Sequence, residues 1–226
     1  MKCQMILGKR ALLEVFRSDK ERILEVFTGN DPVEFQKMGM KARRVNKQLL
    51  LEMAGTEHHQ GVVARVVRRP SLPLSSFFDK QLLLALDGVI DPQNMGAILR
   101  TAEGFGVEGV IWSRNRCCGM TPAVSKASAG ASEVIPFSEV SNLAEALRTL
   151  KDEGFSVAVA DMGGDEGVNF PDKLILVMGS EEKGVQPLIR KMADWVVGIT
   201  MRGQISSLNV SVATAVFLDR YCSRIK

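Results

Sequence analysis

The sequence predicts an α/β protein with a mainly parallel sheet, and three observations support this prediction. Short, continuous apolar runs such as Leu82–Leu86 and Leu174–Met178 are typical of strands that helices cover on both faces. From residue 82 onward these runs alternate with segments of helical periodicity, which is the order expected for a parallel sheet. The chain has 226 residues, 46% of them hydrophobic, and can therefore bury a sizeable core.

Charge and composition divide the chain into two domains. Residues 1–76 carry 14 Lys or Arg against 8 Asp or Glu, a net charge of +6, whereas residues 77–226 carry 15 against 18, a net of −3. The segment 71–76 (SLPLSS) mixes proline and serine without periodicity, which is typical of a linker. We therefore predict one domain over 1–70, a linker over 71–76 and a second domain over 77–226. The basic first domain favours a polyanionic partner such as nucleic acid.

The first domain is expected to contain a helix, a turn and a strand. Within residues 6–27, four apolar residues have helical spacing: Ala11, Leu12, Val15 and Phe16. Gly29–Pro32 is a turn, and the β-branched run that ends at Val67 predicts a strand. Between them lies a basic cluster that includes Arg43, Arg44 and Lys47. This cluster is either a surface that contacts phosphate groups or simply an exposed helix face.

The second domain is expected to alternate strands and helices in chain order. The run at 82–86 begins it, and a loop over 87–94 leads into a helix that Asn94 could cap. The remaining predicted elements are a strand over 107–112, an amphipathic helix over 141–153, strands over 156–160 and 174–178, and a closing strand on the apolar run Val196, Val197 and Ile199, followed by a loop and a capped helix that extends to Arg220. Ligands of such sheets bind beyond the carboxyl ends of the strands.

Several functions are disfavoured by what the motifs lack. The glycines of Gly104–Gly109 match G-x-G-x-x-G, but they follow a helix and lead into a strand, the reverse of a dinucleotide-binding fingerprint. A dehydrogenase is therefore the least favoured of the functions considered. The cysteines Cys3, Cys117, Cys118 and Cys222 form no C-x-x-C pair, which indicates reduced thiols and no metal site.

The sequence favours a cytoplasmic protein. No apolar run approaches the ~20 residues that a transmembrane helix needs. The first ten residues, MKCQMILGKR, have too short an apolar core for a secretory signal. We therefore expect neither membrane insertion nor export.

Three segments at predicted strand ends carry the chemistry. They read N-x-G-A-I-x-R-T-A from Asn94, V-M-G-S-E-x-x-G from Val177, and I-x-M-x-G-x-x-S-S-L-N-V-S-V-A from Ile199. Each segment also has a purely structural explanation. The arginine of the first could be an ordinary exposed charge, the second could be only a tight turn, and the third only a helix cap. Their order, spacing and placement together are specific, and they resemble the three signature motifs of the SpoU (TrmH-type) RNA ribose 2′-O-methyltransferases of the SPOUT superfamily. The resemblance covers residues 82–226.

The first domain is similar to the small L30e-like α/β domain that binds substrate in the 23S rRNA guanosine branch of this family. The stretches ILGKRALLEVF and HHQGVVARV carry this likeness. One departure from the family pattern is Thr200, which stands where the family usually has proline. This substitution removes no reactive group.

The resemblance implies a trefoil knot in the second domain, a homodimer with the active site at its interface, and S-adenosyl-L-methionine as cofactor. By position, the cofactor-binding residues are Gly179, Ile199, Met201 and Leu208. The polar active-site residues are Asn94, Arg100, Glu181, Ser207 and Asn209. No acidic residue is expected to clamp the cofactor ribose. Since a guanidinium barely deprotonates in proteins, Arg100 is expected to hold the ribose-phosphate and to stabilise the alkoxide, not to act as a base.

The leading functional prediction is methylation of the ribose 2′-oxygen of RNA, with a guanosine of 23S rRNA as target. A tRNA 2′-O-methyltransferase is the nearest alternative, although that branch typically lacks the N-terminal domain. The alternative from another class is a non-catalytic RNA-binding or ribosome-assembly factor that kept the fold.

Overall fold

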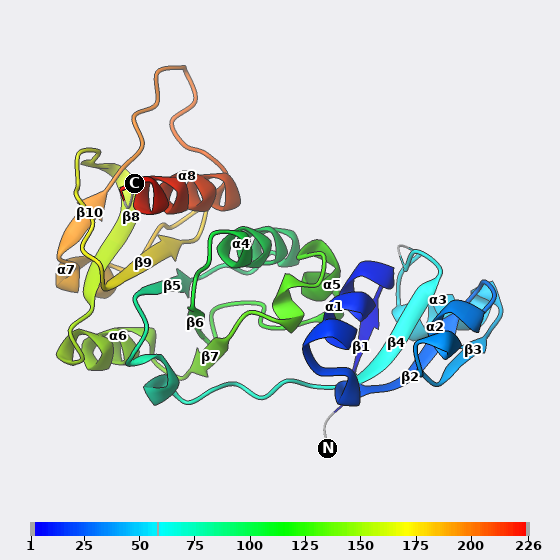
Figure 1. Ribbon diagram of the computed structural model, residues 1–226. Helices are drawn as coiled ribbons and strands as arrows, with labels where there is room; N and C mark the ends of the chain where they lie inside the picture. Colours follow the sequence, from blue (N-terminus) through cyan, green and yellow to red (C-terminus); the bar gives the residue numbers. More distant parts are fainter. Residues whose placement is uncertain (1–2, 58, 225–226) are drawn as a thin grey trace. The chain divides into compact units, whose positions relative to one another are not determined.

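The computed structural model describes residues 3–57 and 59–224 and divides the chain into two compact units (Figure 1). We call residues 1–70 together with 120–134 the N-terminal unit, and residues 71–119 together with 135–226 the C-terminal unit. The segment 120–134 lies inside the second domain expected from sequence, yet it folds with the first. Charge and composition do not indicate that this segment folds with the N-terminal unit.

The N-terminal unit is built on a four-stranded sheet with the order β1-β4-β2-β3. β4 is antiparallel to β1 and β2, while β3 is parallel to β2. The strands are β1 (Cys3–Leu7), β2 (Ile23–Thr28), β3 (Ala42–Arg44) and β4 (Val62–Val67). The helices are α1 (Lys9–Asp19), α2 (Val33–Lys37), α3 (Lys47–Ala54) and α5 (Pro122–Ala127). The predicted N-terminal helix is confirmed, and it buries Ala11, Leu12 and Val15 against the sheet.

An ion pair in the N-terminal unit is almost completely closed to solvent. Arg22 donates from Nη2 to Glu133 Oε2 at 2.8 Å, and the two side chains are 9% and 3% exposed. Gln4 Nε2 donates to Glu133 Oε1 at 3.2 Å, and Arg22 Nε donates to the Val67 carbonyl at 3.0 Å. Burial, followed by the charge of Arg22, lowers the pKa of nearby Arg69. Glu133, from the segment 120–134, is therefore an anchor of the N-terminal unit.

The C-terminal unit contains a six-stranded sheet with the order β10-β8-β9-β5-β6-β7, and every neighbouring pair is parallel. The predicted parallel α/β sheet is thus confirmed. Its strands are β5 (Leu82–Asp87), β6 (Gly109–Ser113), β7 (Phe137–Val140), β8 (Ser156–Asp165), β9 (Leu174–Gly179) and β10 (Trp195–Val197). The edge strand β7 has no counterpart among the expected elements because its four residues, FSEV, carry little apolar signal.

Helices cover both faces of this sheet (Figure 1). They are α4 (Pro92–Gly104), α6 (Leu143–Asp152), α7 (Pro187–Met192) and α8 (Val210–Ser223). Leu147 of α6 packs in one core with Leu83 and Ala85, and the strand alternation turns Leu84 and Leu86 to the other face. On that other face, α4 and α8 pack against each other. None of the helices in the described part of the chain combines the length and hydrophobicity needed to cross a bilayer.

The two helix starts at the motif segments are set by single side chains. The expectation that Asn94 caps α4 is wrong, because Asp91 is the N-cap: its carboxylate accepts from the Gln93 and Asn94 amides at 3.0 and 3.4 Å. Asn209 caps α8 by accepting from the Ser211 amide at 2.8 Å, so Ser207 lies in the preceding loop. The trefoil knot stays a prediction.

Candidate active site

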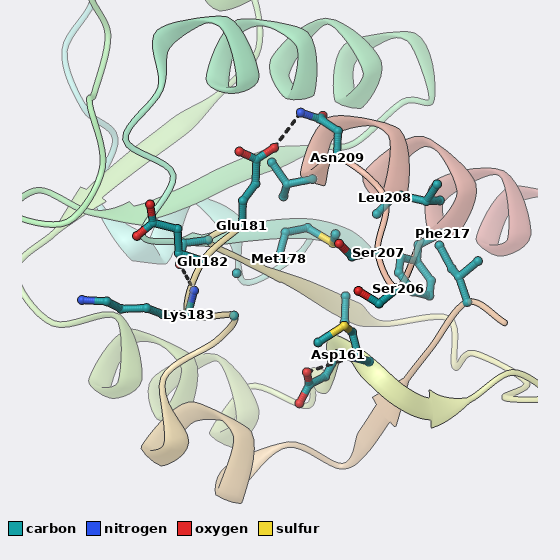
Figure 2. A pocket seen from close by; sticks show the side chains of 18 of the residues that line it. Asp161, Met178, Glu181, Glu182, Lys183, Ser206, Ser207, Leu208, Asn209 and Phe217 are labelled. Atoms are coloured by element: carbon teal, nitrogen blue, oxygen red, sulfur yellow. Dashed lines mark hydrogen bonds between the residues drawn. The ribbon is translucent and has the colours of Figure 1, made fainter. Parts of the chain in front are cut away.

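A cavity of about 710 Å³ lies at the carboxyl end of strand β9 and beside the second half of β8 in the C-terminal unit. Its walls are residues 160–162 of β8, the turn after β9, the loop over 199–209 and the first turns of α8. Figure 2 shows labelled side chains from all of these segments around the space. A cavity of this size suits a small ligand, and its place is the one expected for an open parallel sheet.

The structure brings most of the predicted site residues together in this cavity. All four residues predicted to bind the cofactor line it: Gly179, Ile199, Met201 and Leu208. Three of the predicted polar residues line it as well: Glu181, Ser207 and Asn209. Thr200 is exposed and lies outside the lining, although both of its neighbours face the cavity. The departure from the family pattern therefore changes the loop and not the wall.

The turn after β9 requires glycine at 179. A Cβ atom added to Gly179 would lie 2.2 Å from the Gly184 carbonyl carbon, which is far inside any real contact. The two backbone hydrogen bonds between Ser180 and Gly184, at 3.1 and 3.0 Å, close the turn, and Gly184 has a φ of +64°. The tight turn and the cavity wall are therefore the same structure.

One face of the cavity is apolar. Met178 and Phe217 are each 3% exposed, and Leu208, from the loop before α8, is part of the same lining (Figure 2). Packing between β9 and α8 fixes these positions, since Phe217 is in the buried stripe of α8. Such a surface suits a flat, apolar group such as a purine ring.

The polar rim is organised by Asn209. Its Nδ2 donates to Glu181 Oε1 at 2.6 Å, drawn as a dashed line in Figure 2, and to Asn94 Oδ1 at 2.9 Å. Its Oδ1 accepts from the Ser211 amide and hydroxyl at 2.8 and 2.6 Å, which orients the amide group. One residue thus joins α4, the turn after β9 and the start of α8. The three motif segments meet at this point.

Arg100 is not part of this assembly within one chain. It is exposed on α4 and is absent from the cavity lining. The sequence placed Arg100 with Asn94 because both belong to one motif, but the structure brings only Asn94 to the rim.

Three acidic residues, Asp161, Glu181 and Glu182, are part of the cavity lining. The expectation that no acidic residue clamps the cofactor ribose stays a prediction. Asp161 follows the apolar core of β8 and its Oδ2 accepts from Arg190 Nε at 2.6 Å. Sequence reasoning missed it, although an acidic residue directly after a buried apolar run is a usable signal.

A second cavity of about 460 Å³ adjoins the first, and both include the stretch 180–183 and Val210. Its remaining wall includes Asn94, Asn115 and Arg116. The Arg116 side chain is 44% exposed and donates from Nε to Asp87 Oδ1 at 3.0 Å. Asp87 ends β5 and is fully buried. Neither residue was among the predicted site residues.

The vicinal cysteines beside Arg116 are poor nucleophiles. Burial raises the pKa of the Cys117 thiol, and burial together with neighbouring Cys117 raises the pKa of Cys118 to about 11. None of the four cysteines forms a disulfide. Within residues 3–57 and 59–224, no group of His, Cys, Asp or Glu has the arrangement of a metal site.

The basic cluster of the N-terminal unit is not one helix face. Arg43 and Arg44 lie on β3, whereas Lys47 begins α3, so this alternative is wrong. All three residues are exposed. Arg43 Nη2 lies 3.1 Å from Glu25 Oε1, and its guanidinium carbon lies 4.9 Å from the centroid of the Phe27 ring. This contact holds one cation of the cluster against the sheet.

The fold and the site define an α/β protein with a cofactor-sized cavity at the carboxyl edge of a parallel sheet and a separate basic unit. The chain belongs to the SpoU rRNA methylase family, whose model matches residues 81–219. The model described as RNA 2′-O ribose methyltransferase substrate binding matches residues 5–71. The resemblance found from the three motifs is thereby confirmed.

Similar proteins cover nearly the whole chain. A 23S rRNA (guanosine-2′-O-)-methyltransferase RlmB from Acinetobacter baylyi is 35% identical, with 95% of each chain covered. The Burkholderia protein of the same name is 45% identical over 74% of this chain and 70% of its own. Among solved structures, the AdoMet-bound rRNA methyltransferase from Sinorhizobium meliloti superposes with a TM-score of 0.84 at 22% identity, covering 99% of this chain and 88% of that one.

Proposed function

We propose that the protein transfers a methyl group from S-adenosyl-L-methionine to a ribose 2′-oxygen of RNA, with a guanosine of 23S rRNA as its target. The observation that carries the proposal is the meeting of Asn94, Glu181 and Asn209 on the rim of a cavity lined by Gly179 and Leu208. The names of the relatives support the same reaction and substrate.

The cavity fits this cofactor. Met178, Leu208 and Phe217 supply an apolar slot for the adenine, and the closed turn at Gly179 offers backbone groups at its edge. Asp161 would accept from ribose hydroxyls, in competition with Arg190. The cofactor would supply a methyl group already activated by its sulfonium sulfur, so the protein mainly has to align the reactants.

The polar rim would hold the RNA ribose at the cavity opening. Asn209 fixes the Glu181 carboxylate at 2.6 Å, and this carboxylate would orient the 2′-hydroxyl as it loses its proton. Arg100 would stabilise the developing alkoxide and, because it lies outside the cavity of its own chain, would act on the site of a second copy. We therefore also propose a homodimer whose active sites take groups from both chains, working in the cytoplasm.

Exposed apolar side chains on the C-terminal unit support this pairing. Ile90, before α4, is 74% exposed, and Val212, on α8, is 49% exposed. Mixing Arg100→Ala with Asn209→Ala tests it. Each variant alone should be inactive, whereas randomly mixed dimers should recover roughly a quarter of the wild-type activity because half of them contain one intact site. No recovery on mixing would place Arg100 and Asn209 of one chain in the same site.

Transfer of radiolabelled methyl groups to naked 23S rRNA and to tRNA, followed by alkaline hydrolysis, tests the reaction. Methylation of the ribose leaves a dinucleotide that resists hydrolysis, whereas methylation of a base does not. Labelling of tRNA alone would favour the tRNA alternative. Cofactor binding without labelling of either RNA would favour a non-catalytic RNA-binding factor.

A further inference from the structure

The second cavity adjoins the proposed reaction site and is lined by both acidic and basic groups. Asn94 and Glu181, two of the rim residues, also line this cavity, so it opens beside the point where the ribose would react. Two cations line it, Arg116 and Lys183. The proposed reaction gives Arg116 no role.

Arg116 is held in place by a buried carboxylate. Asp87 is 0% exposed and accepts from three donors: Arg116 Nε at 3.0 Å, the Gln186 amide at 2.7 Å and Gln186 Nε2 at 2.9 Å. A buried carboxylate needs this many partners, and its charge fixes the guanidinium through one edge. Because Asp87 accepts from Nε, N–H groups of the terminal nitrogens stay available to another acceptor, and the side chain as a whole is 44% exposed.

Three acidic residues line the cavity, of which Glu182 is exposed and the other two have hydrogen-bond donors. Asp91 caps α4 by accepting from two backbone amides, and Glu181 accepts from Asn209. A planar fork of N–H donors beside such groups is suited to a phosphate, which it can bind through two parallel hydrogen bonds. The 2′-oxygen of a ribose and the phosphate on its 3′ side are attached to adjacent carbons, so an RNA whose 2′-oxygen reacts at Glu181 brings this phosphate within a few ångströms.

We propose that Arg116 binds the phosphate on the 3′ side of the ribose that is methylated and, with Asp87 as its anchor, positions the RNA strand for the reaction. This inference rests on the proposed RNA methylation. Arg116 is a substrate-positioning residue, and Asp87 acts only through it. Within one chain, Arg116 therefore has the role that the sequence predicted for Arg100, which is to hold a phosphate of the RNA at the cavity.

Replacing Arg116→Met removes the charge and keeps much of the apolar stem. Arg114→Met is the matched control, since Arg114 is exposed on the same loop and is not part of either cavity lining. RNA binding is measured over a range of salt concentrations. The slope of log affinity against log salt should fall by about one charge for Arg116→Met and stay unchanged for Arg114→Met. Cofactor affinity should stay within about twofold, while kcat/KM for RNA should fall at least about tenfold.

A modified substrate identifies the phosphate. An RNA fragment with a neutral methylphosphonate on the 3′ side of the target ribose should bind the wild-type protein more weakly, but should cause no additional loss with Arg116→Met. If that variant does not fold, Arg116→Lys keeps the positive charge and should keep the salt slope while losing several-fold in kcat/KM. Unchanged salt slopes, or a methylphosphonate penalty of equal size in both proteins, would overturn the proposal.

The binding measurements also separate this inference from the proposed reaction. A wild-type protein that binds RNA but methylates none would contradict the proposed function, and a lower slope with Arg116→Met would still support a phosphate site. Efficient methylation of RNA with no effect of Arg116→Met on binding or turnover would contradict only the phosphate site.

Discussion

Both units of the molecule bury a carboxylate that holds an arginine, but the two arginines differ in exposure. In the N-terminal unit, the Arg22 side chain is 9% exposed against Glu133. In the C-terminal unit, the Arg116 side chain is 44% exposed against Asp87. The first pair is almost completely closed to solvent, whereas the second leaves its arginine half-exposed in the lining of a cavity.

This difference separates a structural ion pair from a binding device. Two desolvated ions bind only groups inside the protein, and removing one of them leaves an uncompensated buried charge. A half-exposed arginine on a buried carboxylate keeps part of its hydration and can exchange water for an anionic ligand. The exposure of the cation therefore decides which role an arginine–carboxylate pair can have.

The largest effect is expected from the closed pair. Glu133→Gln should lower the free energy of unfolding by about 3–5 kcal/mol, because Arg22 loses its counter-ion while buried. Chemical denaturation measures this loss. Glu34→Gln, which breaks the exposed pair with Lys9, should cost less than about 1 kcal/mol. Equal losses in the two variants would remove the distinction between closed and open pairs.

A backbone change in the C-terminal unit should act on binding. Gly179→Ala places a methyl group on the backbone of Gly184, so the turn has to open and cofactor affinity should fall about ten- to a hundredfold. Calorimetric titration with S-adenosylmethionine measures this. Gly203→Ala is the control, since an added Cβ there meets nothing within 4 Å. Wild-type affinity in Gly179→Ala would contradict the assignment of the turn to the cofactor site.

A smaller loss of stability is expected from the open pair. Asp87→Asn weakens the bonds from Arg116 and Gln186 to a charged acceptor, which should cost about 1–3 kcal/mol of unfolding free energy. The loss is smaller than for Glu133→Gln because Arg116 stays hydrated. Asp79→Asn, an exposed residue paired with Lys80, should leave stability unchanged. A cost as large as that of Glu133→Gln would mean that both pairs are purely structural.

The smallest effect concerns the thiol beside Arg116. Because burial raises the pKa of Cys118 from 9.0 to about 11, its thiolate fraction at pH 8 is roughly a hundredfold below that of an ordinary thiol. Exposed Cys3 should therefore react with iodoacetamide much faster than Cys118, as peptide mass spectrometry can follow. Since the folded-state pKa is the higher one, Cys118 also stabilises the fold at low pH and loses this contribution as the pH rises toward 11. Faster labelling of Cys118 in Asp87→Asn would show that the open pair holds this loop.

The sequence predicts the parallel sheet well because most strands of this sheet are short, continuous apolar runs. Strands β5 and β9 lie where Leu82–Leu86 and Leu174–Met178 predicted them, and β8 begins at the predicted residue. Prediction from sequence fails where a strand is short and weakly apolar, or where two residues could fill the same role. The edge strand β7 is weakly apolar, and Asn94 and Asp91 compete for one helix cap, a choice that only the backbone geometry decides.

Local motifs predicted the cavity lining but not the anchors. Gly179, Ile199 and Leu208 lie on the wall because each motif follows a strand end. Asp87 and Arg116 belong to no motif pattern, and their pairing joins the end of β5 to the loop after β6, which only the folded sheet brings together. Arg100 shows the converse, since its motif predicted a site residue that the fold of one chain leaves outside the cavity.

Because segment 120–134 folds with residues 1–70, the N-terminal unit is not a detachable module. During synthesis, residues 1–70 emerge long before Glu133. The ion pair between Arg22 and Glu133 therefore cannot form until more than half of the chain has been synthesised. A gene cut at the linker would encode a basic fragment with a buried cation and no partner from that segment. The two family models draw a border near residue 71, but the physical unit of folding crosses it.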